Sequence, residues 1–222
     1  MSDLKARYEE ILKKIANACK RSGRSVSDVH LLAVSKMQPD ELIEDAYALG
    51  VRHFGENYLQ ELERKKEKFS HLQGVNWHLI GPLQSGKVKR ALETVDYFHA
   101  LDSVKMLDEF VKRAGARKKP LPVFIQVNVD DEASKSGIAL SDVNSFVNLV
   151  RKESSLQLVG LMAIPDPTKD TRAAFRKLKS AADKNGDLLL SMGMSDDFES
   201  AIEEGSHWIR IGRTLFGERH VS

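Results

Sequence analysis

Short apolar runs alternate with longer amphipathic stretches over most of the chain. The runs are bounded by polar or glycine-rich loops, which indicates buried strands. They span residues 30–36, 51–55, 75–81, 95–101, 122–129, 156–164, 187–192 and 207–212. The stretches between them have helical spacing and cover residues 39–49, 57–69, 87–93, 103–115, 141–152, 168–185 and 195–204. Eight strands alternating with helices predict an α/β fold, a closed (β/α)8 TIM barrel rather than an open doubly wound sheet.

An additional helix is predicted before the barrel. Apolar side chains recur at helical spacing over residues 3–22, and Gly23 provides a stop signal. Cys19 lies on this apolar stripe, and we expect a small core residue rather than a reactive thiol. Prolines and glycines fall mostly in loops, and no stretch has the composition of a linker. The sequence therefore predicts a single domain over residues 1–222.

Composition and charge narrow the class of protein. The 222 residues are 41% hydrophobic and 30% charged, and 34 basic residues nearly balance 32 acidic ones. Charges of both signs are spread along the chain, which argues against an obligate nucleic-acid binder. With one cysteine and no long apolar run, we expect a cytoplasmic protein without an intrachain disulfide or a membrane span. The seven histidines lack metal-ligand spacing, so no metal site is predicted.

A single lysine ends the first predicted strand. Strand periodicity places Leu32, Val34 and Lys36 on one face, so the amine lies against hydrocarbon. Desolvation disfavours the charged form of a lysine and lowers its pKa, which would make Lys36 a nucleophile for a carbonyl compound. The alternative is a lysine that extends from the strand end into solvent.

The loops after the last two strands have the composition of a phosphate site. In (β/α)8 barrels the chemistry gathers at the C-terminal ends of the strands, and a phosphate commonly binds after strands seven and eight. Ser191 begins the stretch 191–195, and Gly212 and Arg213 follow the last strand. A hydroxyl, accessible backbone N–H groups and a guanidinium suit a phosphate. An amine facing such a site predicts a phosphorylated aldehyde as the ligand.

Arg210 is a charged residue in the middle of the last strand, where it shares a face with Trp208 and Gly212. A buried arginine is costly unless its hydrogen bonds are accepted. Two acceptors are open at this stage: a carboxylate inside the barrel, or a ligand. We favour the ligand.

Three further features have competing interpretations. His78 is more typical of a hydrogen-bonded core histidine than of a catalyst, and Asn57 suits either a helix N-cap or a place beside a ligand. Residues 81–87 match a nucleotide-binding P-loop, but Val88 replaces the Ser or Thr that binds Mg²⁺ and Pro82 removes an N–H, so we reject that function. The polar stretch 130–137 is either an ordinary surface loop or part of the rim.

Seven ordered blocks resemble the YggS/PROSC family of pyridoxal phosphate homeostasis proteins, whose barrel is similar to the N-terminal domain of alanine racemase. The blocks cover residues 33–36, 54–58, 77–84, 132–137, 160–165, 190–197 and 210–212. The resemblance implies that Lys36 holds pyridoxal 5'-phosphate as a Schiff base. It also implies Arg210 at the pyridine nitrogen, Ser191 and Gly212 at the phosphate, and Asn57 beside the ring.

The resemblance further relates Lys135 to a lysine of a proposed second pyridoxal phosphate site. Two positions depart from the family pattern. Arg213 stands where Thr or Ser is usual, so its phosphate contact is either a guanidinium fork or a backbone N–H. The stretch 85–87 reads Ser-Gly-Lys in place of Ser-Asn-Lys, and any role of that amide is lost.

Two classes of function fit these residues. An arginine at the pyridine nitrogen keeps that nitrogen neutral and weakens the electron sink that a racemase needs. The resembling racemases take their second base from a further domain, and the chain ends soon after Gly212, so we expect none here. We therefore favour a monomeric protein that binds pyridoxal phosphate and delivers it, by exchange from Lys36, to apo-enzymes that require it.

The alternative is a weak pyridoxal phosphate enzyme such as an amino-acid racemase. Its second base would be one of four residues: His78, Tyr47, Tyr58 or Tyr97. A third possibility, a barrel that binds a sugar phosphate without a Schiff base, requires that Lys36 is never modified.

Overall fold

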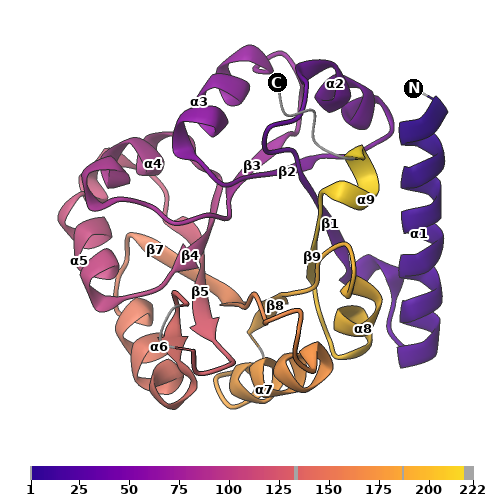
Figure 1. Ribbon diagram of the computed structural model, residues 1–222. Helices are drawn as coiled ribbons and strands as arrows, with labels where there is room; N and C mark the ends of the chain where they lie inside the picture. The colour runs from indigo at the N-terminus through magenta and orange to yellow at the C-terminus, as the bar shows by residue number, and fades with distance from the viewer. Residues whose placement is uncertain (1, 133–134, 187, 218–222) are drawn as a thin grey trace.

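The computed structural model describes residues 2–132, 135–186 and 188–217, in which eight parallel strands close into a barrel (Figure 1). The barrel strands are β1 His30–Val34, β2 His53–Glu56, β3 Asn76–Leu79, β4 Tyr97–Leu101, β5 Leu121–Asn128, β7 Leu156–Met162, β8 Leu189–Ser191 and β9 Trp208–Ile211. Each pairs in parallel with its neighbours, and the pairings β1–β9 and β4–β5 close the ring. The predicted (β/α)8 barrel is confirmed; Asp187, the predicted start of one strand, lies outside the described residues.

Helices surround the barrel on its outer face (Figure 1). They are α2 Asp40–Ala48, α3 Leu59–Lys68, α4 Val88–Thr94, α5 Val104–Lys112, α6 Val143–Arg151, α7 Thr171–Asp183, α8 Phe198–Glu203 and α9 Arg213–Phe216. Single 3₁₀ turns lie at Val26–Asp28, Ser85–Lys87, Ala114–Ala116 and Leu140–Asp142. Among the helices of the described ranges, none has both the length and the apolar content to cross a membrane.

The predicted N-terminal helix is present as α1 Ser2–Ser22, which packs outside the barrel next to α8 and α9 (Figure 1). Most of its apolar stripe is buried, although Leu12 is 41% exposed, and Cys19 is a free cysteine in the core, 1% exposed. Arg7 Nε donates to the Leu215 carbonyl at 2.8 Å, and Arg21 pairs with Glu199 and Glu203. Helix α1 thereby braces the chain that follows β9.

Besides the 3₁₀ turns, a short strand and a short helix were not predicted. The two-residue strand β6, Ile138–Ala139, pairs with the end of β5, and α9 follows β9 directly. Both lie at the C-terminal ends of barrel strands. They are too short for hydrophobic periodicity to reveal them.

Strand register brings the first and last strands together at one rim. Leu32 pairs with Arg210 and Ala33 with Ile211 across β1 and β9. The residues that follow these strands, Lys36 on one side and Gly212 on the other, therefore meet at the C-terminal end of the barrel. Leu32 and Arg210, which pair across these two strands, are 178 residues apart in the sequence.

Candidate functional site

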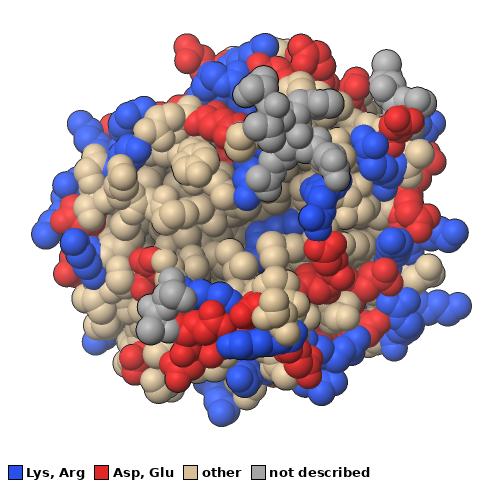
Figure 2. Space-filling view, in the orientation of Figure 1, with Lys and Arg blue, Asp and Glu red and all other residues tan. Residues whose placement is uncertain are grey.

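A cavity of about 790 Å³ opens at the C-terminal ends of the strands. Figure 2 shows it as a hollow in the middle of this face, with basic side chains visible inside it. Five of the six predicted ligand-binding residues line it: Lys36, Asn57, Arg210, Gly212 and Arg213. Its volume is in the usual range of small-molecule sites.

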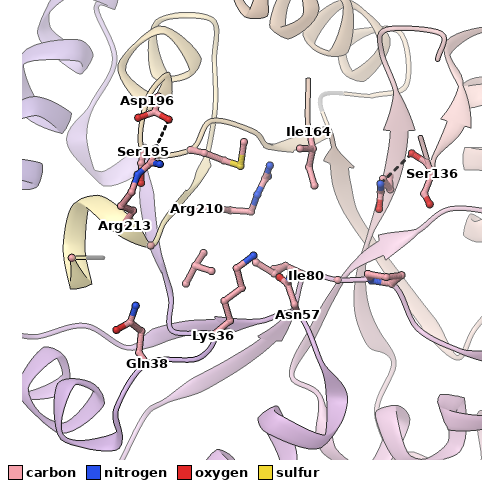
Figure 3. Close-up of a pocket in the computed structure, with 17 residues that line it drawn as sticks. Lys36, Gln38, Asn57, Ile80, Ser136, Ile164, Ser195, Asp196, Arg210 and Arg213 are labelled. Carbon is pink, nitrogen blue, oxygen red and sulfur yellow. Dashed lines mark hydrogen bonds and ion pairs between the residues drawn. The ribbon is translucent and has the colours of Figure 1, made fainter. Parts of the chain in front are cut away.

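Lys36 lies two residues beyond β1, and its half-buried side chain extends toward the centre of the cavity (Figure 3). Leu32 and Val34 are buried on the same face, as strand periodicity predicts. Met37 follows with a φ of 56°, a left-handed conformation that non-glycine residues rarely adopt. The turn that carries Lys36 is therefore held in an unusual backbone conformation.

Arg210 extends from β9 into the same space and is only 4% exposed (Figure 3). Its Nη1 donates to the Ser191 carbonyl at 2.6 Å and to Ser191 Oγ at 2.9 Å, and its Nη2 donates to the Ala163 carbonyl at 2.8 Å. These acceptors are neither of the two that the sequence left open. Burial lowers the pKa of Arg210 to about 10, although the nearby Asp197 opposes the shift, so the side chain stays cationic at neutral pH.

Ser191 is the predicted residue that the structure does not bring to the cavity lining. Its side chain is fully buried below the rim, between Arg210 and His99. Ser195, four residues further along the same loop, lines the cavity instead. The loop turns at Gly193, whose φ is 91° and where a Cβ would lie 2.5 Å from the Cβ of Ala201. Glycine is therefore required for the turn that exposes Ser195.

The loops after β8 and β9 form one wall of the cavity. The backbone N–H of Thr214 donates to Ser195 Oγ at 3.3 Å. Arg213 Nη2 donates to Asp196 Oδ2 at 2.6 Å, and this pair is exposed at the rim (Figure 3). A hydroxyl, a glycine and a guanidinium thus lie together on the wall, as the sequence predicted for 191–195 and 212–213, but with Ser195 as the serine.

Gln38 lines the cavity and was not singled out from the sequence. Its side chain is 7% exposed, and Oε1 has no hydrogen-bond partner among the described residues. A buried amide oxygen without a partner is costly, and a bound ligand or water at this position would satisfy it. The position, two residues after Lys36, is the only sequence signal that points to it.

A chain of hydrogen-bonded histidines fills the barrel interior below Arg210. His53 Nδ1 and His78 Nε2 are 2.9 Å apart, His78 Nδ1 and His99 Nε2 are 2.9 Å apart, and His99 Nδ1 is 3.0 Å from Ser191 Oγ. Tyr97 stacks on His78 with ring centroids 4.4 Å apart. Burial lowers the pKa of all three histidines, to about 4 for His53, so the chain is neutral at pH 7.

The hydrogen-bonded histidines predict that the protein loses stability in acid, and that part of this loss comes from His53. Because its pKa falls from 6.5 to about 4 on folding, its contribution to the unfolding free energy is complete above pH 6.5 and is lost as the pH falls toward 4. We expect that contribution to be roughly 1–3 kcal/mol, since the side chain is only partly buried. Urea unfolding of the wild type and of His53→Gln at several pH values measures it.

The difference between the two proteins isolates the histidine. Glu56, whose burial raises its pKa to about 7, has the opposite dependence over the same pH range in both. A difference in unfolding free energy that stays constant from pH 7 to pH 4.5 would contradict the prediction.

Comparison with known proteins extends this description. A family model described as the alanine racemase N-terminal domain matches residues 10–220. A Pseudomonas aeruginosa protein named pyridoxal phosphate homeostasis protein is 43% identical over 224 residues, which cover 99% of this chain and 97% of that protein. An Escherichia coli protein of the same name is 39% identical and covers 100% of this chain and 99% of its own length. The chain belongs to the pyridoxal phosphate homeostasis protein family.

A solved member of the same fold is PipY of Synechococcus elongatus, described with pyridoxal phosphate bound. It superimposes with a TM-score of 0.79 at 34% identity and covers 93% of this chain and all of that one. The family resemblance expected from the seven sequence blocks is thus confirmed over nearly the whole length.

The racemase alternative requires a second base in the cavity. The four residues considered for that role lie outside the cavity lining. His78 is fully buried and held by two histidines, and Tyr97 begins β4 at the opposite end of the barrel. Tyr47 donates to the Gln73 carbonyl on the outside, and Tyr58 is 61% exposed at the start of α3. None of these four described side chains is placed as an acid or base opposite Lys36.

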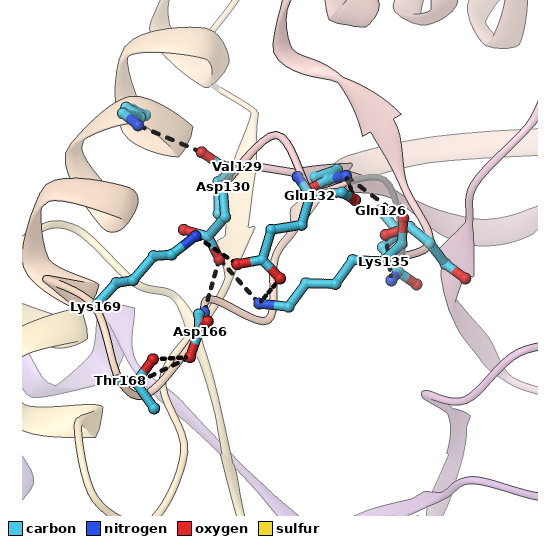
Figure 4. A network of polar contacts seen from close by, with 11 residues as sticks. Gln126, Val129, Asp130, Glu132, Lys135, Asp166, Thr168 and Lys169 are labelled. Carbon is cyan, nitrogen blue, oxygen red and sulfur yellow. Dashed lines mark hydrogen bonds and ion pairs between the residues drawn. The ribbon is translucent and has the colours of Figure 1, made fainter.

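Lys135 belongs to an ionic network on the loop after β5 (Figure 4). Its Nζ is 3.1 Å from Asp130 Oδ2 and 3.5 Å from Glu132 Oε2, and Lys169 Nζ is 2.6 Å from Glu132 Oε1. Burial acts to lower the pKa of Lys135, but the carboxylates outweigh it and raise the pKa. Ser136 lines the cavity, so this loop reaches the rim, while Ala133 and Ser134 lie outside the described residues.

The P-loop-like stretch also has a structural explanation. A Cβ at Gly81 would lie 2.3 Å from the Asn57 carbonyl oxygen, so only glycine allows the loops after β2 and β3 to approach this closely. This approach places Asn57 and Gly81 side by side in the cavity lining.

Proposed function

We propose that this protein binds pyridoxal 5'-phosphate in the cavity, with the amine of Lys36 as the point of covalent attachment, and passes it on without turning over a substrate. The observation that carries the proposal is that Lys36 and the buried cation Arg210 extend into one cavity whose wall bears Ser195, Gly212 and Arg213. When bound, pyridoxal phosphate supplies an aldehyde carbon that takes up an amine with loss of water.

The residues fit this ligand by size and by donor set. The cavity is large enough for a substituted pyridine with its phosphate, and Gln38 offers a buried oxygen that has no hydrogen-bond partner among the described residues. Gly212 lines the cavity without a side chain, and Ser195 and Arg213 provide the polar side chains for a phosphate. Arg210 is fixed by its carbonyl contacts and would donate to the ring nitrogen, with Asn57 beside the ring.

Two features support binding without turnover. A permanently protonated donor at the ring nitrogen leaves that nitrogen without a proton, which weakens electron withdrawal by the ring. The four described residues that were candidates for a second base do not line the cavity. Ser191, first expected at the phosphate, supports Arg210 from below instead.

Turnover and transfer are tested separately. Purified protein loaded with pyridoxal phosphate is expected to produce D-alanine from L-alanine no faster than its Lys36→Ala variant, and to restore activity to an apo-enzyme that requires the cofactor. Steady D-alanine formation that depends on Lys36 would favour the racemase. Failure to restore the apo-enzyme, although Lys36 is loaded, would remove delivery from the proposal and leave binding.

Arg213→Ala tests the proposed phosphate wall. The side chain is exposed and already paired with Asp196, so we expect only about a fivefold loss of affinity for pyridoxal phosphate and no change for pyridoxal, which has no phosphate. Fluorescence titration measures both. Arg90→Ala, which removes an exposed arginine paired with Glu63 outside the cavity, is the control. Equal losses for the two ligands would show that Arg213 does not contact the phosphate.

Several finer expectations complete the proposal. We propose one domain over residues 1–222 and a monomer that acts in the cytoplasm, a reducing compartment in which the free Cys19 thiol is stable. The proposed recipients are apo-enzymes whose active-site lysine takes pyridoxal phosphate from Lys36.

A further inference from the structure

A fully buried lysine lies behind the turn that carries Lys36. Lys65 is on α3, on the same apolar stripe as Leu59 and Leu62, and its side chain is 0% exposed. A lysine is almost never fully buried unless it is paired. Its position between helix and strand places it outside the cavity lining, so it has no direct role in the proposed ligand site.

Among the described residues, the Lys65 amine donates to acceptors on β2, on α3 and in the turn after β1. The Nζ donates to the Ser35 carbonyl at 2.6 Å, to Glu56 Oε1 at 2.8 Å and to Glu61 Oε1 at 2.8 Å. Glu56 Oε1 also accepts from Ser35 Oγ at 2.6 Å. The residue before Lys36 is thus held through both its backbone and its side chain.

The residue after Lys36 is held by the same cluster. Glu61 Oε1, which accepts from Lys65, also accepts from the backbone N–H of Met37 at 2.8 Å. Met37 has the strained φ of 56°, which persists only where its surroundings impose it. One buried ammonium therefore fixes the peptide groups on both sides of Lys36.

The cluster is a poor source of net stability. Desolvation offsets most of the attraction in a buried ion pair, and Glu56 Oε2 is buried with no hydrogen-bond partner among the described residues. Burial raises the pKa of Glu56 although Lys65 and Ser35 act to lower it. The main effect of the cluster is therefore on the geometry of the turn that carries Lys36.

We propose that Lys65, with Glu56 and Glu61, is a positioning group that aims the Lys36 amine at the ligand aldehyde. This rests on the proposed function. In the reaction the Lys36 nitrogen bonds to the aldehyde carbon, and the aldehyde oxygen leaves as water with the two amine protons. Lys65 takes no part in the bond changes; it lowers the cost of bringing the amine to the carbon.

Two ligands separate covalent capture from binding. Pyridoxal 5'-phosphate has the aldehyde, whereas pyridoxine 5'-phosphate has an alcohol in its place and binds only non-covalently. The variant is Lys65→Met with Glu56→Gln, which removes the two fully buried charges together; Glu61 loses the Lys65 amine but is partly exposed and still accepts from the Met37 N–H. Lys66→Met is the matched control, because Lys66 is the next residue on α3 and its amine pairs with Asp96, away from Lys36.

We expect the double variant to lose affinity for pyridoxal phosphate roughly tenfold, with a similar fall in the rate at which borohydride-trapped pyridoxyl accumulates on Lys36. Its affinity for pyridoxine phosphate should stay within about twofold of the wild type, and Lys66→Met should change neither. Equal losses for both ligands would indicate general distortion of the cavity and overturn the inference. An unchanged affinity for both would also overturn it.

A second variant tests the inference in case the double variant does not fold. Glu61→Ala leaves the Lys65–Glu56 pair intact and removes the carboxylate that accepts from both the Met37 N–H and the Lys65 amine, so a loss of about threefold confined to pyridoxal phosphate is expected. No loss in this variant overturns the inference. If the wild type itself binds both ligands equally and traps no pyridoxyl on Lys36, the proposed function fails, which is a different result from any change caused by Lys65.

Discussion

Replacement of Lys36 by alanine is expected to abolish covalent capture of pyridoxal phosphate and to lower its affinity at least about 100-fold, or about 2.8 kcal/mol. Lys36 is the lysine that lines the cavity among the described residues, and the turn that carries it is fixed from behind by Ser35 and Met37 contacts. No other described amine is placed to replace it. The visible absorption band that the bound ligand gives as a conjugated imine should be absent from the variant.

Borohydride reduction followed by peptide mass spectrometry checks the site directly. The wild type should carry the pyridoxyl group on the peptide that contains Lys36, and Lys36→Ala should carry none there. Lys135→Ala is the matched control, because Lys135 is a second lysine at the same end of the barrel that is ion-paired with Asp130 and Glu132. Trapping that persists in Lys36→Ala and disappears in Lys135→Ala would show that the ligand attaches to Lys135, which would contradict the prediction.

Much of the fold was predictable because the signal is repeated. Each barrel strand is a short apolar run followed by a loop and a helix, so eight units gave eight chances to recognise the pattern. The ends of elements were less certain, since α3 begins at Leu59 rather than at residue 57, where Asn57 turns into the cavity. Local sequence does not say whether a polar residue at such a boundary caps the helix or faces a ligand.

Site residues at the ends of strands could be predicted from the sequence. The path of the loops and the hydrogen-bond partners of buried side chains were harder to predict. Lys36, Gly212 and Arg213 lie one or two residues beyond the ends of buried strands, and the rule for barrels places them at the rim. The structure places Ser191 below the cavity and Ser195 in its lining, because the chain turns at Gly193, and hydrophobic periodicity does not reveal that turn. The carbonyl acceptors of Arg210 come from β8 and from the end of β7, contacts between segments that sequence spacing does not specify.

The sequence contained a sign of the Lys65 cluster, a lysine at an apolar position of a helix, but periodicity alone does not say what that lysine does. Spacing with Leu59 and Leu62 places Lys65 on the apolar stripe of α3, which conflicts with the usual exposure of lysine. Such a conflict between local pattern and residue type is a common mark of a functional or strained position. The partner Glu56 comes from the neighbouring strand, and only the fold brings the two together.

Arg210→Met is expected to have the second largest effect, on stability as well as on binding. It removes a buried cation, takes the Arg210 donor from the Ala163 carbonyl, and leaves the Ser191 carbonyl with the Ala163 N–H at 3.2 Å as its remaining described donor. An acceptor that loses its partner in the core costs about 1–3 kcal/mol, so we expect the unfolding free energy of the ligand-free protein to fall by roughly 2–5 kcal/mol. Urea unfolding without ligand measures this loss.

The same variant should weaken pyridoxal phosphate binding roughly tenfold while borohydride still traps the ligand on Lys36 at saturation, because Arg210 supplies a hydrogen bond and not the covalent link. Arg24→Met is the matched control. Arg24 is a half-buried arginine that also donates to two carbonyls, those of Ile202 and Ser206, and it lies outside the cavity lining. It should lose stability and keep its affinity. If Arg210→Met were as stable as the wild type and bound the ligand equally well, Arg210 would be neither the support of β8 nor a donor to the ring, and the cavity would have to bind pyridoxal phosphate in another orientation.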